Sequence, residues 1–132
     1  MRLKERRLIR PLFDRSRNDA HTLARGSVRL VYRIVPRDEL KVATPLKVGV
    51  APGRGLRRAV DRNQVKRHLR EAFRLNQESL RRLFEQRDDT LTMMILYRSG
   101  LPVEGPTIQM DTKRALEALH NRLSPGTSNA AG

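Results

Sequence analysis

The stretch "TLTMMILYRSG", residues 90–100, is an apolar run without a charged side chain until Arg98. The run has the length of a strand, and Gly100 and Pro102 mark its end. A strand with so little polar cover is expected at the centre of a sheet, buried on both faces. Helices must then cover the sheet, which indicates a fold with layers of helices and strands.

Two further strands are predicted before this central one. The sequence "SVRLVYRIV", residues 27–35, alternates, so that Val28, Leu30, Tyr32 and Ile34 share one face while Arg29, Val31, Arg33 and Val35 share the other. The next predicted strand lies in the stretch "TPLKVGVAPG", residues 44–53, where Val48 and Val50 continue the apolar face before Pro52 and Gly53 end it. We expect these two strands to pair with each other in antiparallel fashion. The polar residues 18–26 are expected to form a turn.

Helical periodicity predicts three helical regions. The first covers residues 3–16 in spite of Pro11, and the last covers residues 107–123. Between them, an apolar stripe with Val65, Leu69 and Phe73 predicts a long helix that either continues past Asn76 or breaks there. Residues 124–132 are small and polar, so we expect a disordered tail behind a single domain of residues 1–123.

The charge of the chain indicates a polyanionic partner. Lys and Arg number 28 against 14 Asp and Glu, a net charge of +14, and nucleic acid is the first candidate. No apolar run is long enough to span a membrane. There is no cysteine, which excludes disulfides and thiolate metal sites and is consistent with a cytoplasmic protein. The basic N-terminal residues lack the features of a targeting segment.

Positive charge is concentrated in residues 54–74, which hold eight Lys and Arg against two acidic residues. On a helix, Arg58, Arg62, Lys66 and Arg70 follow one another at every fourth position and make a basic ridge. A solvated charged face is the plain alternative. The predominance of Arg, whose planar guanidinium binds phosphate through two hydrogen bonds, favours contact with a nucleic-acid backbone.

The pattern Arg62-Asn63-x-x-Lys66-Arg67-x-x-Arg70-Glu71, with Ala59-Val60 before it and Ala72-Phe73-Arg74 after it, resembles the signature helix of the bacterial ribonuclease P protein component. The resemblance is strong over residues 46–75 and loose over the rest of residues 3–123. That family assists a catalytic RNA in removing the 5′ leader of precursor tRNA. The resemblance implies an endoribonuclease subunit that is a monomer within the ribonucleoprotein, with the catalytic RNA and precursor tRNA as partners and no DNA.

The resemblance also implies a fold. The family has an α+β, two-layer α-β sandwich in the order αβββαβα, with a four-stranded sheet. Its strand-helix-strand crossover is left-handed, against the general rule for parallel strands.

Site residues follow from the resemblance position by position. The residues expected to face RNA are Arg54, Arg57, Arg58, Arg62, Asn63, Lys66, Arg67, Arg70 and Arg74. A cleft for the single-stranded leader would be lined by Phe13, Arg17 and Tyr32, although core packing is an equal alternative for both aromatic residues. The sequence departs from the family in the turn at residues 52–55, where only Arg54 is charged. It also has Arg17 where a second aromatic residue is usual.

No active site on the protein is predicted. His21, His68 and His120 lie far apart without acidic neighbours at ligand spacing, so no metal site is expected. The resemblance assigns hydrolysis to the RNA subunit and its Mg²⁺, with no cofactor bound by the protein alone. The alternative function is that of a structural RNA binder, such as a small ribosomal protein. A basic leucine-zipper protein is disfavoured because the leucines lack a heptad repeat.

Overall fold

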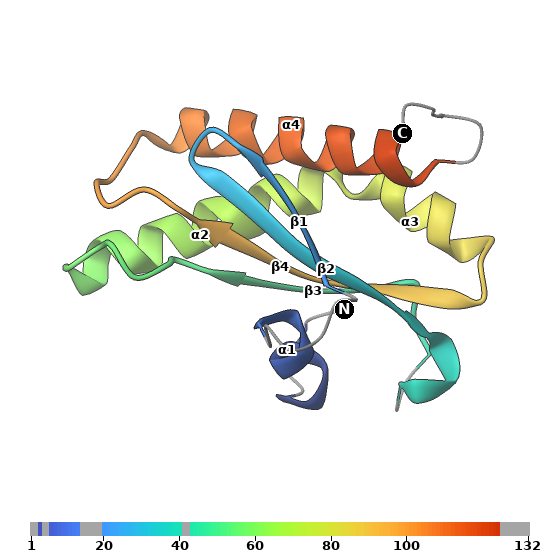
Figure 1. Ribbon diagram of the computed structural model, residues 1–132. Coiled ribbons are helices and arrows are strands. Elements are labelled where there is room, and N and C mark those ends of the chain that lie inside the picture. Colours follow the sequence, from blue (N-terminus) through green and yellow to red (C-terminus); the bar gives the residue numbers. More distant parts are fainter. Residues whose placement is uncertain (1–2, 4–5, 14–19, 41–42, 125–132) are drawn as a thin grey trace.

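The protein consists of a four-stranded sheet with helices on both faces (Figure 1). The computed structural model describes residues 3, 6–13, 20–40 and 43–124. The elements are α1 (Arg6–Phe13), β1 (His21–Arg25), β2 (Val28–Pro36), the 3-10 turn η1 (Arg37–Glu39), β3 (Leu46–Ala51), α2 (Ala59–Asn76), α3 (Glu78–Glu85), β4 (Asp89–Tyr97) and α4 (Gly105–Leu123). Helices α2, α3 and α4 cover one face and α1 lies on the other. The predicted α+β class is confirmed.

The low-charge strand β4 is central, as predicted. The strand order is β1-β2-β4-β3, and β4 runs antiparallel to β2 and parallel to β3. Met93 of β4 is opposite Tyr32 on one side and Val48 on the other. Leu91, Met93 and Ile95 have no exposed surface.

Two predictions about the sheet were wrong. Strands β2 and β3 do not pair with each other, because β4 lies between them. The predicted turn at residues 18–26 contains the strand β1, which pairs with β2 through a turn at Gly26 and Ser27. Gly26 has a φ of 55°, which suits glycine. Only Leu23 of β1 is buried, so this edge strand has too few apolar residues to stand out in the sequence.

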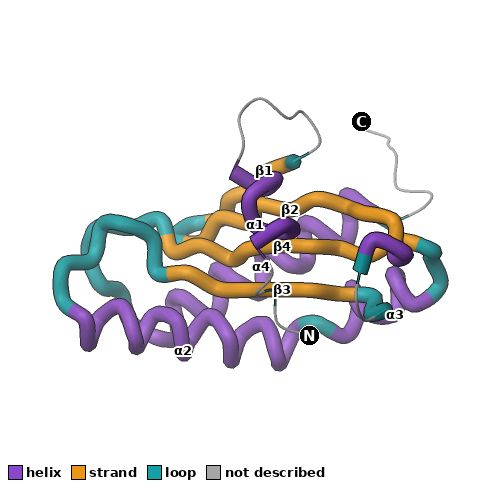
Figure 2. The backbone as a smooth tube through the Cα atoms, turned by 90° about the horizontal axis from the view of Figure 1, so that it is seen from below, coloured by secondary structure: helices purple, strands orange, loops and turns teal. Residues whose placement is uncertain are grey.

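The crossover between β3 and β4 has the left-handed sense that the family resemblance implies. Seen from the α1 side in Figure 2, the chain runs along β3, returns behind the sheet through α2 and α3, and enters β4 as the next strand. This hand is rare among parallel connections. It places the start of α2 next to the end of β3, at the same edge of the sheet as the end of β4.

Two apolar clusters hold the layers together. The larger one lies between the sheet and the helices α2, α3 and α4, and includes Leu69, Phe84 and Leu116. The smaller one lies on the other face, where Leu8 and Leu12 of α1 pack against Val31 of β2. Alternation along β2 therefore separates its side chains between two different environments.

The helix ends differ in part from prediction. The long helix breaks after Asn76, whose side-chain amide donates to the carbonyl of Ala72 at 2.7 Å. Such a bond competes with backbone pairing and favours a helix end. Helix α4 starts at Gly105, two residues earlier than predicted, with Pro106 in its first turn. The described part of the first helix is shorter than residues 3–16, and the predicted tail at residues 125–132 lies outside the described residues.

Candidate nucleic-acid interface

Helix α2 is fixed by one apolar face that packs on the sheet. Val65, Leu69 and Ala72 are at most 2% exposed. Burial of a side chain of this class contributes about 1.5–3 kcal/mol for Val or Leu. Repulsion between like charges one turn apart is only about 0.2–0.5 kcal/mol per pair. The apolar contacts therefore decide the orientation of the helix, and the charged side chains take the positions that remain.

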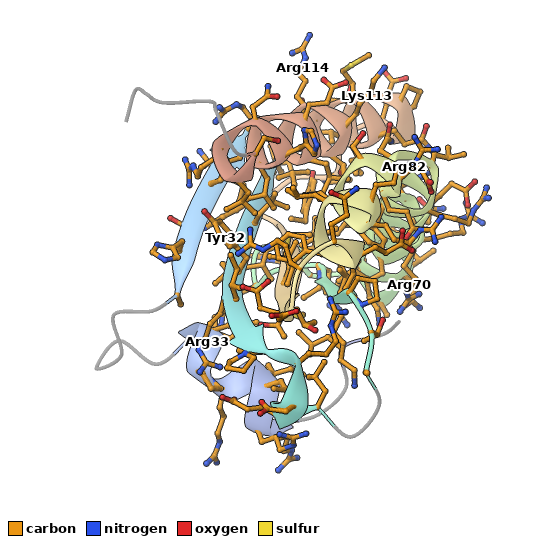
Figure 3. All side chains as sticks on the ribbon, turned by 90° about the vertical axis from the view of Figure 1, so that its right-hand side faces the viewer. Tyr32, Arg33, Arg70, Arg82, Lys113 and Arg114 are labelled. Carbon is orange, nitrogen blue, oxygen red and sulfur yellow. The ribbon has the colours of Figure 1, made fainter. Side chains whose placement is uncertain are left out.

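The exposed side of α2 carries a strip of basic and amide side chains. At about 100° per residue, Asn63, Arg67 and Arg70 lie opposite the buried stripe, and all three are exposed. Figure 3 shows Arg70 at the outer surface of the molecule. Arg57 and Arg58, which come just before the helix, are also exposed. We call these five residues the basic face.

Arg62 does not belong to the basic face, contrary to the predicted outward ridge. Its guanidinium Nη1 donates to the carbonyl oxygens of Leu56 at 3.2 Å and Arg57 at 2.7 Å. Arg62 and Lys66 are both half-buried. Residues four apart differ by about 40° around a helix, so a ridge at this spacing winds away from one direction. Arg62 thus holds the segment that leads into the helix.

Arg74, at the end of the predicted RNA-facing set, is paired with an acid. Its Nε lies 3.3 Å from Glu71 Oε1, and its Nη2 bonds the other carboxylate oxygen. The hydrogen bond from Arg74 lowers the pKa of Glu71 below its ordinary value. The charge of Arg74 is therefore partly neutralised within the protein, although the side chain is exposed.

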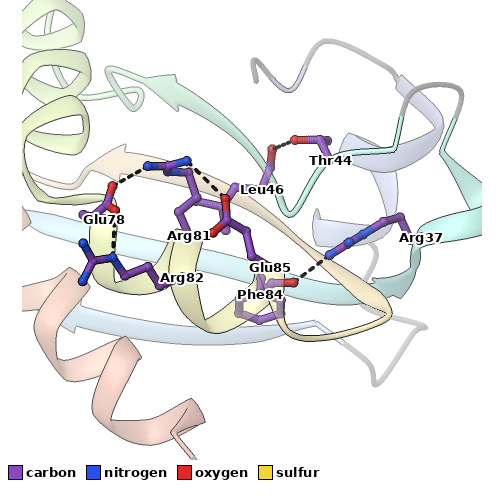
Figure 4. Close-up of polar contacts among 8 residues, drawn as sticks. All are labelled: Arg37, Thr44, Leu46, Glu78, Arg81, Arg82, Phe84 and Glu85. Carbon is purple, nitrogen blue, oxygen red and sulfur yellow. Dashed lines mark hydrogen bonds and ion pairs between the residues drawn. The ribbon is translucent and has the colours of Figure 1, made fainter.

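Helix α3 shows the ordinary arrangement of surface arginines. Glu78 accepts hydrogen bonds from Arg81 at 2.6 Å and Arg82 at 2.9 Å, and Arg81 also bonds Glu85 at 3.2 Å (Figure 4). These hydrogen bonds lower the pKa of Glu78. On the basic face, no described carboxylate lies within ion-pair distance of Arg57, Arg58, Arg67 or Arg70. Both helices are rich in Arg, but the arginines of α3 are paired with acids, whereas those of the basic face have no described carboxylate partner.

A groove of about 820 Å³ lies on the α1 side of the sheet. It extends from the end of α1 across β2 and the end of β4 to the loop after β3. Its described lining residues are Leu12, Phe13, Ala20, Thr22, Arg29, Val31, Ala51, Pro52, Gly53, Arg54, Leu96, Tyr97 and Arg98. Phe13, which the family resemblance assigns to a cleft for the leader, is among these lining residues.

The groove contains Phe13 but not Tyr32. Phe13 is 50% exposed, which is unusual for a large apolar side chain beside a cluster of buried leucines. Tyr32 is 2% exposed and packs in the larger core on the opposite face, where its hydroxyl accepts a hydrogen bond from Arg122 at 3.2 Å. Figure 3 shows Tyr32 on the helix side and Arg33 toward α1. The predicted place of Tyr32 in the cleft was therefore wrong, and Arg17 lies outside the described residues.

Two groove arginines were missed by the sequence analysis. Arg29 of β2 shares its face with Val31, and Arg98 follows β4 with its N–H bonded to the carbonyl of Ser27 at 2.9 Å. The alternation of β2 did separate Arg29 and Val31 from Tyr32. What the alternation could not tell was which of the two faces α1 would cover.

Arg54 lines the groove as well, so it belongs there rather than to the basic face. The turn before it depends on Gly53, which has a φ of 75°. A Cβ at Gly53 would collide with the carbonyl oxygen of Tyr97. Close contact of this glycine with the end of β4 sets the course of the loop and brings Arg54 to the groove. Residues 52–58 thus join the groove to the basic face.

The described residues include no group of three or more His, Cys, Asp or Glu side chains that could hold a metal ion. His21, His68 and His120 lie on β1, α2 and α4. Among the helices described, none is both long and apolar enough to cross a membrane.

Comparisons with known proteins agree on one family. The family model described as ribonuclease P matches residues 1–120. A ribonuclease P protein component from Porphyromonas gingivalis is 34% identical over 89 residues, which span 67% of this chain and 64% of that protein. A structure of the Staphylococcus aureus RNase P protein has a TM-score of 0.63 at 18% identity and covers 89% of this chain and 94% of that one. For the Thermotoga maritima RNase P protein the TM-score is 0.61 at 20% identity, with 94% and 98% covered.

Proposed function

The chain belongs to the ribonuclease P protein family, and on that premise we propose that it is the protein subunit of ribonuclease P, a ribonuclease of tRNA processing. In this role it binds a catalytic RNA and precursor tRNA and assists removal of the 5′ leader in the cytoplasm. It acts as a monomer within the ribonucleoprotein.

The observation that carries this proposal is the unpaired charge of the basic face. Four arginines without a described carboxylate partner lie on and just before a helix whose orientation is fixed by buried residues. Arg binds phosphate through two hydrogen bonds, and release of counterions from RNA favours such contacts. The basic face, with Lys66 at its border, therefore docks on the catalytic RNA.

The groove supports the second part of the proposal, binding of the single-stranded leader. Phe13 offers an exposed ring on which a base can stack, a contact that contributes about 1–3 kcal/mol. Arg29, Arg54 and Arg98 supply positive charge along the same groove. Single-stranded nucleic acid is commonly bound by this combination of a charged groove and aromatic side chains.

Hydrolysis itself is assigned in this proposal to the RNA subunit with its bound Mg²⁺. The three histidines are on separate elements, and the described acidic residues do not gather in the groove. The protein then contributes binding energy and reduces repulsion between RNA phosphates. That contribution is greatest when few Mg²⁺ ions are present to screen the same charges.

The test is a cleavage assay with the cognate catalytic RNA and a precursor tRNA at low Mg²⁺ concentration. The wild-type protein should strongly stimulate cleavage at the mature 5′ end, and a variant with Arg67→Gln and Arg70→Gln should stimulate less. Arg81→Gln on α3 is the matched control, because that arginine is already paired with Glu78 and Glu85. Tight binding to ribosomal RNA without stimulation would favour a structural RNA binder instead.

A further inference from the structure

A second pocket lies on the helix side of the sheet, where α2 ends and α3 begins beside α4 (Figure 1). Its volume of about 450 Å³ falls in the range of about 300–1,000 Å³ that is usual for small-ligand sites. Leu80 and Leu116 supply buried apolar surface, and Leu75 at the end of α2 is 60% exposed. The polar lining residues are Asn76, Glu78, Ser79, Glu117, His120 and Asn121. We call this site the helix pocket.

The break between α2 and α3 leaves hydrogen-bonding groups in the helix pocket. The amide nitrogen of Asn76 donates to the carbonyl of Ala72 at 2.7 Å, and no described residue donates to the Asn76 Oδ1 atom. Ser79 in α3 and Asn121 in α4 are exposed and have no described side-chain partner. The pocket therefore offers both donors and acceptors to a ligand.

The two carboxylates of the helix pocket differ in their partners. Glu78 accepts hydrogen bonds from Arg81 and Arg82, so its oxygens are occupied within the protein. Glu117 is exposed and has no described hydrogen-bond or ion-pair partner. Glu117 is thus the pocket carboxylate that is available to an outside donor.

The chemistry of a free carboxylate favours one RNA base. A carboxylate accepts two parallel N–H bonds, one on each oxygen. Guanine is the RNA base with two adjacent N–H donors on its Watson–Crick edge, the N1–H and the exocyclic N2 amino group. The guanine O6 atom on the same edge accepts hydrogen bonds, and Asn121, one turn after Glu117 on α4, carries an amide that can donate to it. The exposed side chain of Leu75 adds an apolar contact for the flat base.

Positive charge beside the pocket matches the phosphate of a nucleotide. Lys113 precedes Glu117 by one turn and lies on the same side of α4. It is exposed, and no described carboxylate pairs with it or with Arg114; Figure 3 shows both side chains at the outer surface. A cationic ligand for Glu117 would be repelled by these two side chains. A neutral base with an attached phosphate satisfies both the carboxylate and the positive charges.

We propose that the helix pocket binds an unpaired guanine of the catalytic RNA, with Glu117 accepting hydrogen bonds from its N1–H and N2 amino groups and Lys113 contacting the adjoining phosphate. The inference rests on the proposed function, since it takes the catalytic RNA as the partner of α2. It adds a base-specific contact to the phosphate contacts of the basic face. The helix pocket is separate from the groove, which lies on the α1 side of the sheet.

The first experiment probes the guanines of the catalytic RNA with kethoxal, which modifies N1 and N2 of unpaired guanines. The wild-type protein should protect one guanine whose protection is lost when the holoenzyme is assembled with Glu117→Gln. Guanines that the basic face shields should stay protected with both proteins. If the same guanines are protected with both proteins, or if none is protected, the proposal is overturned.

The second experiment measures affinity for the catalytic RNA. Glu117→Gln should weaken binding about tenfold, the effect expected when a pair of hydrogen bonds to a base edge is lost. Glu104→Gln is the matched control, because Glu104 is an exposed acid that precedes α4 and lies outside the pocket lining. Removal of a negative charge by itself favours binding to RNA, so the control should bind as tightly as the wild type or more tightly. Equal affinities of the two variants would refute the role of Glu117.

A change in the RNA connects the two results. Inosine in place of the protected guanine lacks the N2 amino group, so it should weaken binding of the wild-type protein and have little further effect on Glu117→Gln. Additive losses would mean that Glu117 and this base do not touch. Cleavage of precursor tRNA by the wild-type holoenzyme separates the two levels of the argument. If the wild type fails to stimulate cleavage, the proposed function is wrong, whereas normal stimulation with unchanged behaviour of Glu117→Gln refutes the guanine site alone.

Discussion

Replacing Arg62 by Ala should destabilise the protein more than it weakens contact with RNA. The guanidinium holds two carbonyl groups, at Leu56 and Arg57, in the segment before α2. A hydrogen bond from a charged donor contributes about 1.5–3 kcal/mol. Both bonds come from one nitrogen of a half-buried side chain, so the decrease in stability is expected at the low end, about 1.5 kcal/mol. With a urea dependence of about 1–3 kcal/mol/M, the unfolding midpoint should fall by roughly 0.5–1.5 M.

Arg67→Ala is the control for this measurement. Arg67 is exposed and has no described carboxylate partner, so its removal should change the free energy of unfolding by less than about 0.5 kcal/mol. For binding of the catalytic RNA the order should be reversed, with a larger effect of Arg67→Ala than of Arg62→Ala. For Arg67→Ala the slope of log K against log salt should fall by about 0.9, because one RNA phosphate is no longer neutralised by the protein, while for Arg62→Ala the folded protein should keep its slope.

The reasoning about Arg62 is refuted by a specific pair of results. They are a urea midpoint equal to that of the wild type and a salt slope that falls as much as for Arg67→Ala. Together these would mean that Arg62 leaves its carbonyl partners and binds RNA, as the simple ridge at every fourth residue predicts.

Three further predictions follow from the groove, its loop and α3. Phe13→Ala should weaken holoenzyme binding of precursor tRNA by about 1–3 kcal/mol and leave binding of mature tRNA unchanged; equal weakening of both would make it a packing residue. Gly53→Ala should lower the free energy of unfolding by about 1–3 kcal/mol, because residue 53 has a positive φ and the new Cβ would collide with the carbonyl oxygen of Tyr97. Gly100→Ala is the control in the same urea titration and should be nearly neutral, because the space around Gly100 is open. Arg81→Ala should raise the pKa of Glu78 toward its ordinary value in an NMR titration. Because folding lowers that pKa, the pairing stabilises the protein above the ordinary Glu pKa and is lost as pH falls through the lowered value; an unchanged pKa would contradict the ion pair.

The sequence was informative where burial imposes a strong pattern. The run from Leu91 to Tyr97 predicted the central strand correctly, since a strand buried on both faces needs few charges. The stripe of Val65 and Leu69 likewise predicted α2 and its buried side. In contrast, β1 has one buried residue and is held mainly by backbone pairing with β2. Backbone pairing does not require an apolar pattern, so there was little sign of this strand in the sequence.

The candidate site was less predictable because it depends on contacts between distant elements. Alternation in β2 separated Tyr32 from Val31, but only the position of α1 shows that Val31 faces the groove. Arg98 could not be assigned before the pairing of β2 with β4 was known. Arg62 differs from Arg67 through bonds to the backbone of the preceding loop, which no charge pattern reveals.

The loop of residues 52–58 determines how the groove and the basic face are placed relative to each other. Gly53 packs against the end of β4 at one end of this loop, and Arg62 bonds the carbonyls of residues 56 and 57 at the other. The segment between the groove and the basic face is therefore held in place at both ends. If both surfaces bind RNA at once, this loop works as a fixed spacer that sets how far the leader lies from the catalytic RNA, and a change in its length would shift one RNA relative to the other.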